Sequence, residues 1–114
     1  MKDLQIGLVI ATRDLTFTHS DGSVEFVKIS IGAPVADGDD AWACPYLIQA
    51  ESFQKLFRMI GGDSLQSLIH TTHILTDELT ALSRKHTGTF TYFGETDLML
   101  PPPEYLGHRN RGGA

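Results

Sequence analysis

Alternating hydrophobic and polar residues in the first half of the chain predict β-strands. The alternation runs through residues 4–19, and a change of phase near residues 11–14 indicates a bulge. The Asp21-Gly22 pair that follows is typical of a hairpin turn. Residues 24–32 are therefore expected to form the return strand of a hairpin.

Two further strands follow from the same kind of pattern. Residues 89–93, rich in threonine and aromatic residues, predict one of them. Residues 42–50 predict the other, although Pro45 has no backbone N–H to give to a neighbouring strand. This proline indicates an edge position, or a site where the N–H would point outward. The inner face of the strand would carry Trp42, Cys44, Tyr46 and Ile48.

Between these strands the hydrophobic period changes to that of helices. Residues 52–60 carry apolar side chains at helical spacing and predict a short helix that ends at the following glycine pair. Asp63 then begins a longer predicted helix that reaches about Lys85, with Gln66 placed as the partner in a capping box. Its buried stripe would consist of Leu65, Leu68, Ile69, Thr72, Leu75, Leu79 and Leu82.

This order of elements predicts a single α+β domain over residues 1–106. We expect an antiparallel sheet of about four strands, with one short and one long helix packed on one face. Residues 107–114 are expected to form a flexible C-terminal tail.

The composition is that of an ordinary globular domain. The chain has 114 residues, 41% of them hydrophobic and 20% charged, which favours neither a disordered nor a membrane protein. No apolar run approaches the length of a membrane-spanning helix, and the N-terminal residues do not resemble a signal peptide. One cysteine gives no internal disulfide. We therefore expect a cytoplasmic protein without a membrane partner.

The net charge of −5 lies in the first half of the chain. Residues 1–51 carry 3 basic and 8 acidic groups, whereas residues 52–114 carry 6 of each. An acidic surface argues against nucleic-acid binding, which needs positive charge. It would suit a basic protein partner, although it is also the charge that keeps many proteins soluble.

The segment HTTHILTDE, residues 70–78, contains the side chains that most resemble a metal site. On the predicted helix His70, His73 and Asp77 share one face, almost opposite the buried stripe. Two imidazoles and a carboxylate could bind zinc or nickel with a fourth group from elsewhere. The same residues also suit a solvated helix face, and we favour that interpretation. No metal, cofactor or catalytic residue is therefore assigned.

An apolar residue on this outward face suggests self-association instead. Ile74 is predicted to point to solvent, with Ala81 on the same side of the helix. We take these two residues as interface candidates for a homodimer, the alternative being ordinary surface.

Other candidate chemistry is weaker. Cys44 is expected to be buried and inert because it lies on the inner face of a strand. The loop with Asp37, Asp39 and Asp40 has carboxylates at calcium-loop spacing but lacks the rest of that pattern.

Several short motifs resemble a known family. They are the segments IGAP at residues 31–34, WACPYLI at 42–48, GDSLQSL at 62–68 and FTYFG at 90–94, with Leu100-Pro101 near the end. Together they resemble a family of short bacterial proteins classed as a domain of unknown function. The resemblance would span about residues 5–102 and implies a bacterial source. It implies no reaction and no site residues.

These observations lead to two hypotheses of function. The first is a small non-enzymatic protein-interaction domain of an accessory or immunity type, with a second copy or a basic protein as partner. The alternative is a module that binds a small ligand or metal, or an enzyme, with a pocket between sheet and helices.

Overall fold

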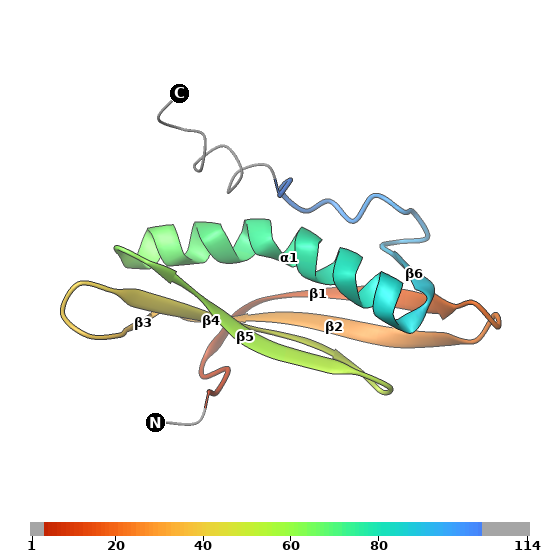
Figure 1. Cartoon of the computed structure of the whole chain (residues 1–114), viewed down its shortest axis with the longest axis horizontal. Coiled ribbons are helices and arrows are strands. Elements are labelled where there is room, and N and C mark those ends of the chain that lie inside the picture. The colour runs from red at the N-terminus through yellow and green to blue at the C-terminus, as the bar shows by residue number, and fades with distance from the viewer. Residues whose placement is uncertain (1–3, 104–114) are drawn as a thin grey trace.

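A computed structural model describes residues 4–103 as one antiparallel sheet covered by one helix. The single helix, α1, spans Ser64–His86 and lies across one face of the sheet (Figure 1). The strands are β1 (Val9–His19), β2 (Val24–Gly32), β3 (Val35–Ala36), β4 (Trp42–Ala50), β5 (Gln54–Gly61) and β6 (Gly88–Thr91).

Strand pairing places β5 and β6 at the two margins of the sheet. Strand β1 pairs with β2 on one side and with β6 on the other, and β2 pairs in turn with β4. The other edge of β4 pairs with β5 along its whole length. The short strand β3 continues the β2 side of β4, at Ala43 and Trp42. The order is therefore β5, β4, β2 with β3, β1, β6.

The hydrophobic core lies between α1 and the sheet. Alternate residues of the central strands point to the helix, as the period of two requires. Three leucines of the helix meet them, and the sheet contributes aromatic residues at one end. The buried core side chains include Leu15, Phe17, Val27, Ile29, Tyr46, Ile48, Leu75, Leu79 and Phe90.

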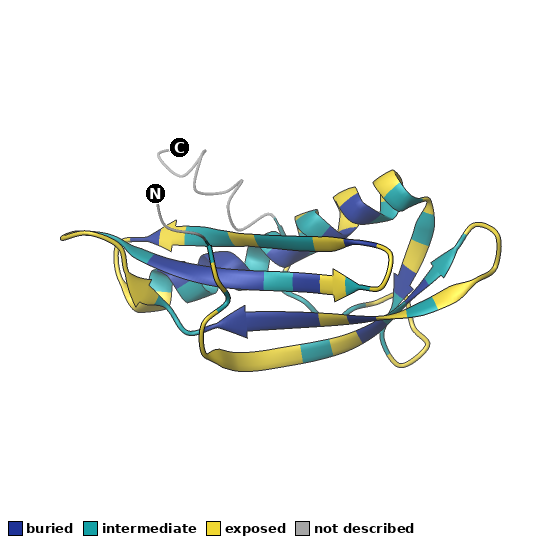
Figure 2. Ribbon diagram, turned by 90° about the horizontal axis from the view of Figure 1, so that it is seen from below, coloured by how far each residue is buried: buried dark blue, intermediate teal, exposed yellow. Residues whose placement is uncertain are grey.

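The opposite face of the sheet is partly covered by the chain before β1. Figure 2 shows this segment crossing the sheet on the side away from α1. It passes so close to β2 that a Cβ on Gly32 would lie 2.0 Å from the Ile6 carbonyl oxygen. The hairpin end of the same face is open, and Phe26 there is 84% exposed.

The predicted short helix at residues 52–60 is wrong, because this segment is strand β5. The sheet consequently has six strands rather than about four, and one helix rather than two packs on it. Residues 50–53 form a hairpin turn in which the Ala50 N–H donates to the Phe53 carbonyl at 2.9 Å. The apolar residues of β5 are spread over both of its faces because α1 covers only one side of this marginal strand.

The bounds of α1 agree closely with the prediction, and so does its cap. The Asp63 carboxylate accepts the Gln66 N–H at 2.7 Å and satisfies a backbone donor of the first turn. The Gln66 amide oxygen reaches back to the N–H of Gly62, one residue before the position expected for a capping box. Thr87 ends the helix in the left-handed conformation, with φ of 53°.

The buried stripe of α1 agrees only in part with the prediction, because Leu75, Leu79 and Leu82 are buried as expected but other members are not. Leu65, expected inside, is 62% exposed. The face that packs on the sheet is instead centred roughly 80° further round the helix and consists of Ser67, His70, Thr71, Leu75, Leu79 and Leu82. The small side chain of Ser67 allows close approach, since a Cβ on Gly61 of β5 would lie 2.4 Å from the Ser67 nitrogen.

Pro45 is not on an edge strand, but its position explains why it is tolerated. It pairs with Arg58 of β5 on one side. On the other side, the pairing of β4 with β2 ends at Tyr46 and its pairing with β3 begins at Ala43. Pro45 lies between these two paired parts. The missing N–H therefore falls at a gap in the neighbouring strands.

Candidate functional site

The structure places the three residues that were considered as a metal cluster in different environments. His70 is buried, with 8% of its surface exposed, and its Nδ1 donates to the Ile60 carbonyl of β5 at 3.0 Å. The prediction that it lies opposite the core is therefore wrong. His73 is half-buried and its Nδ1 lies 2.6 Å from the Pro102 carbonyl, whereas Asp77 is exposed. Within residues 4–103 no three metal-ligating side chains are grouped to hold a metal ion.

The segment after β6 crosses back over the molecule and is held by side chains. The Arg13 guanidinium of β1 donates to the carbonyls of Leu98 and Met99 at 2.9 and 2.7 Å. The Thr76 hydroxyl of α1 donates to the Pro101 carbonyl at 2.9 Å. We call residues 97–102 the strap, because they connect β1 with α1 without joining the sheet.

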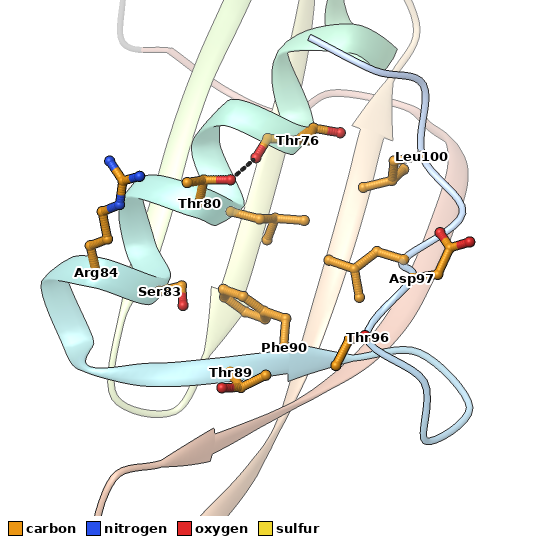
Figure 3. A pocket seen from close by; sticks show the side chains of 11 residues that line it. Thr76, Thr80, Ser83, Arg84, Thr89, Phe90, Thr96, Asp97 and Leu100 are labelled. Carbon is orange, nitrogen blue, oxygen red and sulfur yellow. Dashed lines mark hydrogen bonds between the residues drawn. The ribbon is translucent and has the colours of Figure 1, made fainter.

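An open groove of about 410 Å³ lies between the strap, β6 and the C-terminal half of α1. Figure 3 shows Arg84 on the helix side of this groove and Asp97 on the strap side. Its floor is apolar, with Leu79 and Phe90 from the core. Five residues with hydroxyl groups also line the groove: Thr76, Thr80, Ser83, Thr89 and Thr96.

Several hydroxyls of the groove are held by hydrogen bonds within the protein. Three of its hydroxyls already donate to backbone carbonyls: Thr76 to Pro101, Thr80 to Thr76 and Ser83 to Gly88. A second cavity of about 240 Å³ lies under the other side of the strap and is largely apolar.

A carboxylate, an imidazole and a hydroxyl meet where two hairpin turns come together. Glu25 of β2 accepts from the N–H and the hydroxyl of Ser52, and it also contacts Nε2 of His19. The Ser52 hydrogen bond, followed by that of His19, lowers the pKa of Glu25 to about 2. Because Ser52 donates to the carboxylate and not to the histidine, the group ties the turns together rather than activating a nucleophile.

A second polar group connects the helix with the sheet. The Tyr46 side chain of β4 is completely buried, and its hydroxyl donates to the Glu78 carboxylate of α1. Glu78 also lies 3.8 Å from the Lys55 ammonium of β5. Burial raises the pKa of Tyr46 above its usual value, and the hydrogen bond and charge of Glu78 raise it further. The group stabilises the fold and faces none of the described cavities.

The other candidate residues from the sequence lie either in the core or in an exposed loop. Cys44 is fully buried, and its Sγ lies 3.4 Å from the Gly32 carbonyl. Burial raises the pKa of its thiol, which keeps it protonated and unreactive. Asp37, Asp39 and Asp40 lie exposed in the loop between β3 and β4.

The outer edge of β5 is the largest feature that the sequence did not reveal. In an antiparallel pair, alternate residues exchange hydrogen bonds with the neighbour and the residues between them point their backbone groups away. The Ala50–Phe53 bond fixes this alternation, so Lys55, Phe57 and Met59 bond to β4. The N–H and C=O groups that face away from β4 belong to Gln54, Leu56, Arg58 and Ile60.

None of the described strands pairs with this edge, and apolar side chains flank it. Phe57 is 49% exposed and Ile60 44% exposed.

The two interface candidates of the helix lie in different surroundings. His70 and Glu78 of α1 contact Ile60 and Lys55 of β5. Ile74 lies one turn from each of them on the same helix face. It is half-buried against the core, so the prediction that it points to solvent is wrong. Ala81, the other interface candidate, is exposed.

Comparison with known proteins gives a family but no activity. The family model described as domain of unknown function DUF6968 matches residues 11–102. The chain belongs to this family. The match covers most of the chain and agrees with the resemblance inferred from the sequence motifs. No curated protein and no solved structure matches the chain. In the described residues of this DUF6968 domain, α1 is not apolar enough to span a membrane.

Proposed function

We propose that this DUF6968 domain is a protein-interaction domain that binds its partner through the open edge of β5. The observation that carries this proposal is a row of outward backbone donors and acceptors with exposed apolar side chains beside it. Such an edge is a template for another strand, and proteins usually cover or blunt it. An extended segment added to a sheet edge gains main-chain hydrogen bonds, while side chains at alternate positions select the sequence.

Strand β5 lacks two of the devices that protect an edge, a proline and a bulge. It contains no proline, and its register with β4 is continuous from Gln49–Gln54 to Trp42–Gly61, without a bulge. The opposite margin is different, because β6 pairs over only 4 residues and the strap is fastened beside β1. This contrast selects β5 as the binding edge.

The charges of β5 disfavour a partner segment that places a basic residue directly opposite Lys55 or Arg58. Lys55 and Arg58 are its only charged residues. Lys55 is partly neutralised by Glu78, and no ion pair joins Arg58 to another of residues 4–103. A basic protein partner, in turn, would meet the exposed aspartates between β3 and β4. An accessory or immunity-type role is one form that such binding would take.

The experiment compares two substitutions of Arg58 in peptide binding. Extended peptides are selected on the wild-type chain from a displayed library, and their Kd values are measured by fluorescence anisotropy. Arg58→Pro removes an N–H that faces the open edge but donates nothing to β4, whereas Arg58→Gln keeps that N–H and removes the charge. We expect Arg58→Pro to weaken binding about ten-fold or more and Arg58→Gln to weaken it less. Equal Kd values for all three proteins, with melting temperatures unchanged, would refute edge binding.

The groove beside α1 supports a second candidate function, the binding of a small molecule. Its apolar floor and hydroxyl-lined wall are typical of ligand sites, and Arg84 and Asp97 stand on opposite rims. A fragment screen by NMR tests this alternative. Ligands that shift the amide signals of Thr80 and Thr96 but not those of β5 would support it, whereas the absence of such shifts would remove it.

A further inference from the structure

We infer that the strand received by β5 is the β5 of a second copy of this chain, in an antiparallel pair with its two-fold axis at Phe57. This inference rests on the proposed function and adds the identity of the partner and the register. Four properties of the edge lead to it: the positions of its backbone groups, the placement of its charges, the extent of overlap, and the side chain on the axis.

The backbone groups restrict the register. The outward N–H and C=O groups belong to even-numbered residues, Gln54 to Ile60, so each of these must face an even-numbered residue of the second copy. With the axis at Phe57, Leu56 faces Arg58 of the second copy, and Gln54 faces Ile60. The Ile60 carbonyl already accepts from His70, and its second lone pair remains for the partner strand.

Charge and overlap together exclude the neighbouring registers. An axis at Lys55 or at Arg58 would place a basic side chain directly opposite its own copy, which destabilises a strand pair. An axis at Phe57 places Lys55 opposite Met59 and Arg58 opposite Leu56, so no like charges face each other. An axis at Leu56 also avoids this clash, but it pushes Ile60 opposite the hairpin turn. The Phe57 axis keeps every residue from Gln54 to Ile60 paired within the strand.

Phe57 is suited to the position on the axis. It would form a pair without mutual hydrogen bonds, in which opposite side chains approach most closely. Phe57 is 49% exposed in the single chain and lies under the Lys55 ammonium, 5.5 Å from the ring centre. Two such rings would cover each other across the axis. Because directly opposite residues point to the same face, the two α1 helices would lie side by side, with Ile74 near the contact.

The test measures association of the full chain by sedimentation velocity. We expect the wild type to form a dimer at micromolar concentrations. Phe57→Lys and Phe57→Glu should each weaken the dimer ten-fold or more, because like charges then meet on the axis, and an equimolar mixture of the two should recover it. The matched control is Phe26→Lys, an exposed phenylalanine on the other face, which should leave the dimer unchanged.

A cysteine substitution tests the register independently. Opposite Cα atoms of such a pair lie about 4.5 Å apart, within the range that a disulfide can bridge. Phe57→Cys should therefore give a covalent dimer when oxidised with diamide, whereas Ile60→Cys, opposite Gln54, should not. The native Cys44 is buried and does not compete.

The outcomes separate this inference from the proposed function. A wild type that stays monomeric at about 1 mM overturns the dimer, and so does a mixture of the two charge variants that fails to associate. If Arg58→Pro still abolishes peptide binding in those cases, the edge binds other proteins and the proposed function stands. A dimer that forms equally well with Arg58→Pro and with Phe57→Lys contradicts the dimer interface inferred here.

Discussion

Removing one buried hydroxyl should measure how strongly α1 is fixed to the sheet. In the Tyr46→Phe variant the ring remains, so the cavity is no larger than an oxygen atom. The lost interaction is a hydrogen bond to a carboxylate, a class of bond that contributes about 1.5–3 kcal/mol. Glu78 keeps Lys55 at 3.8 Å, and 17% of its side chain is open to water. We therefore expect the free energy of unfolding to fall by about 1–2 kcal/mol at pH 7, near the lower end of that range.

The pH dependence of this loss gives it a specific signature. An unfolded tyrosine ionises near pH 10, whereas burial and Glu78 raise the pKa of Tyr46 in the folded protein. The stabilisation is therefore complete below pH 10 and decreases as the pH rises above it, because the unfolded state then releases the proton first. The difference between wild type and Tyr46→Phe should consequently shrink above pH 10.

Urea unfolding followed by circular dichroism at several pH values measures both effects. Tyr92→Phe is the control, because the Tyr92 hydroxyl forms no hydrogen bond within residues 4–103 and its ring packs over Arg13 instead. Equal stability of wild type and Tyr46→Phe at pH 7, or a difference that does not change up to pH 11, would refute this reasoning.

Three other substitutions have matched controls or a defined pH range. Glu25→Gln should lower the free energy of unfolding by about 1–2 kcal/mol at pH 7. Because the pKa of Glu25 is lowered to about 2 in the folded protein, this difference from wild type should vanish as the pH falls from about 4.5 to 2. Chemical unfolding at several pH values measures it. Asp63→Ala should cost about 1 kcal/mol through the lost helix cap, and exposed Asp77→Ala should cost less than half of that; equal losses in thermal melts would contradict the cap. Gly61→Ala should destabilise the protein by several kcal/mol because its Cβ would lie 2.4 Å from a helix nitrogen. In the control Gly62→Ala the new Cβ meets only a flexible side chain, so the loss should be about 1 kcal/mol or less. A tolerated Gly61→Ala would show that helix and strand can separate.

The strands with regular alternation were predictable, whereas the marginal strand was not. Residues 24–32 and 42–50 are strands with the predicted bounds, because the central strands bury one continuous face. In β5 and the residue before it, the apolar positions 53, 56, 57 and 60 coincide with helical spacing, and a short run cannot distinguish the two periods. The open edge of β5 was therefore not predicted, because a segment predicted to be a helix presents no sheet edge.

The orientation of α1 could not be read from leucine positions alone. Ser67 and Thr71 are fully buried because each donates its hydroxyl within the helix, to the Ser64 and Ser67 carbonyls. A hydrophobic pattern counts serine and threonine as polar, so it predicts that these positions face the solvent. Ile74 is consequently half-buried against the core, one helical turn from the two helix residues that contact β5.

Residue-level amide exchange of β5 tests the central claim most directly. At low concentration the amides of Leu56 and Arg58 should exchange rapidly, while those of Lys55, Phe57 and Met59 are protected by their bonds to β4. Raising the concentration into the dimer range should slow exchange at Leu56 and Arg58. Rapid exchange at these two amides in a sample that is fully dimeric would contradict the binding edge.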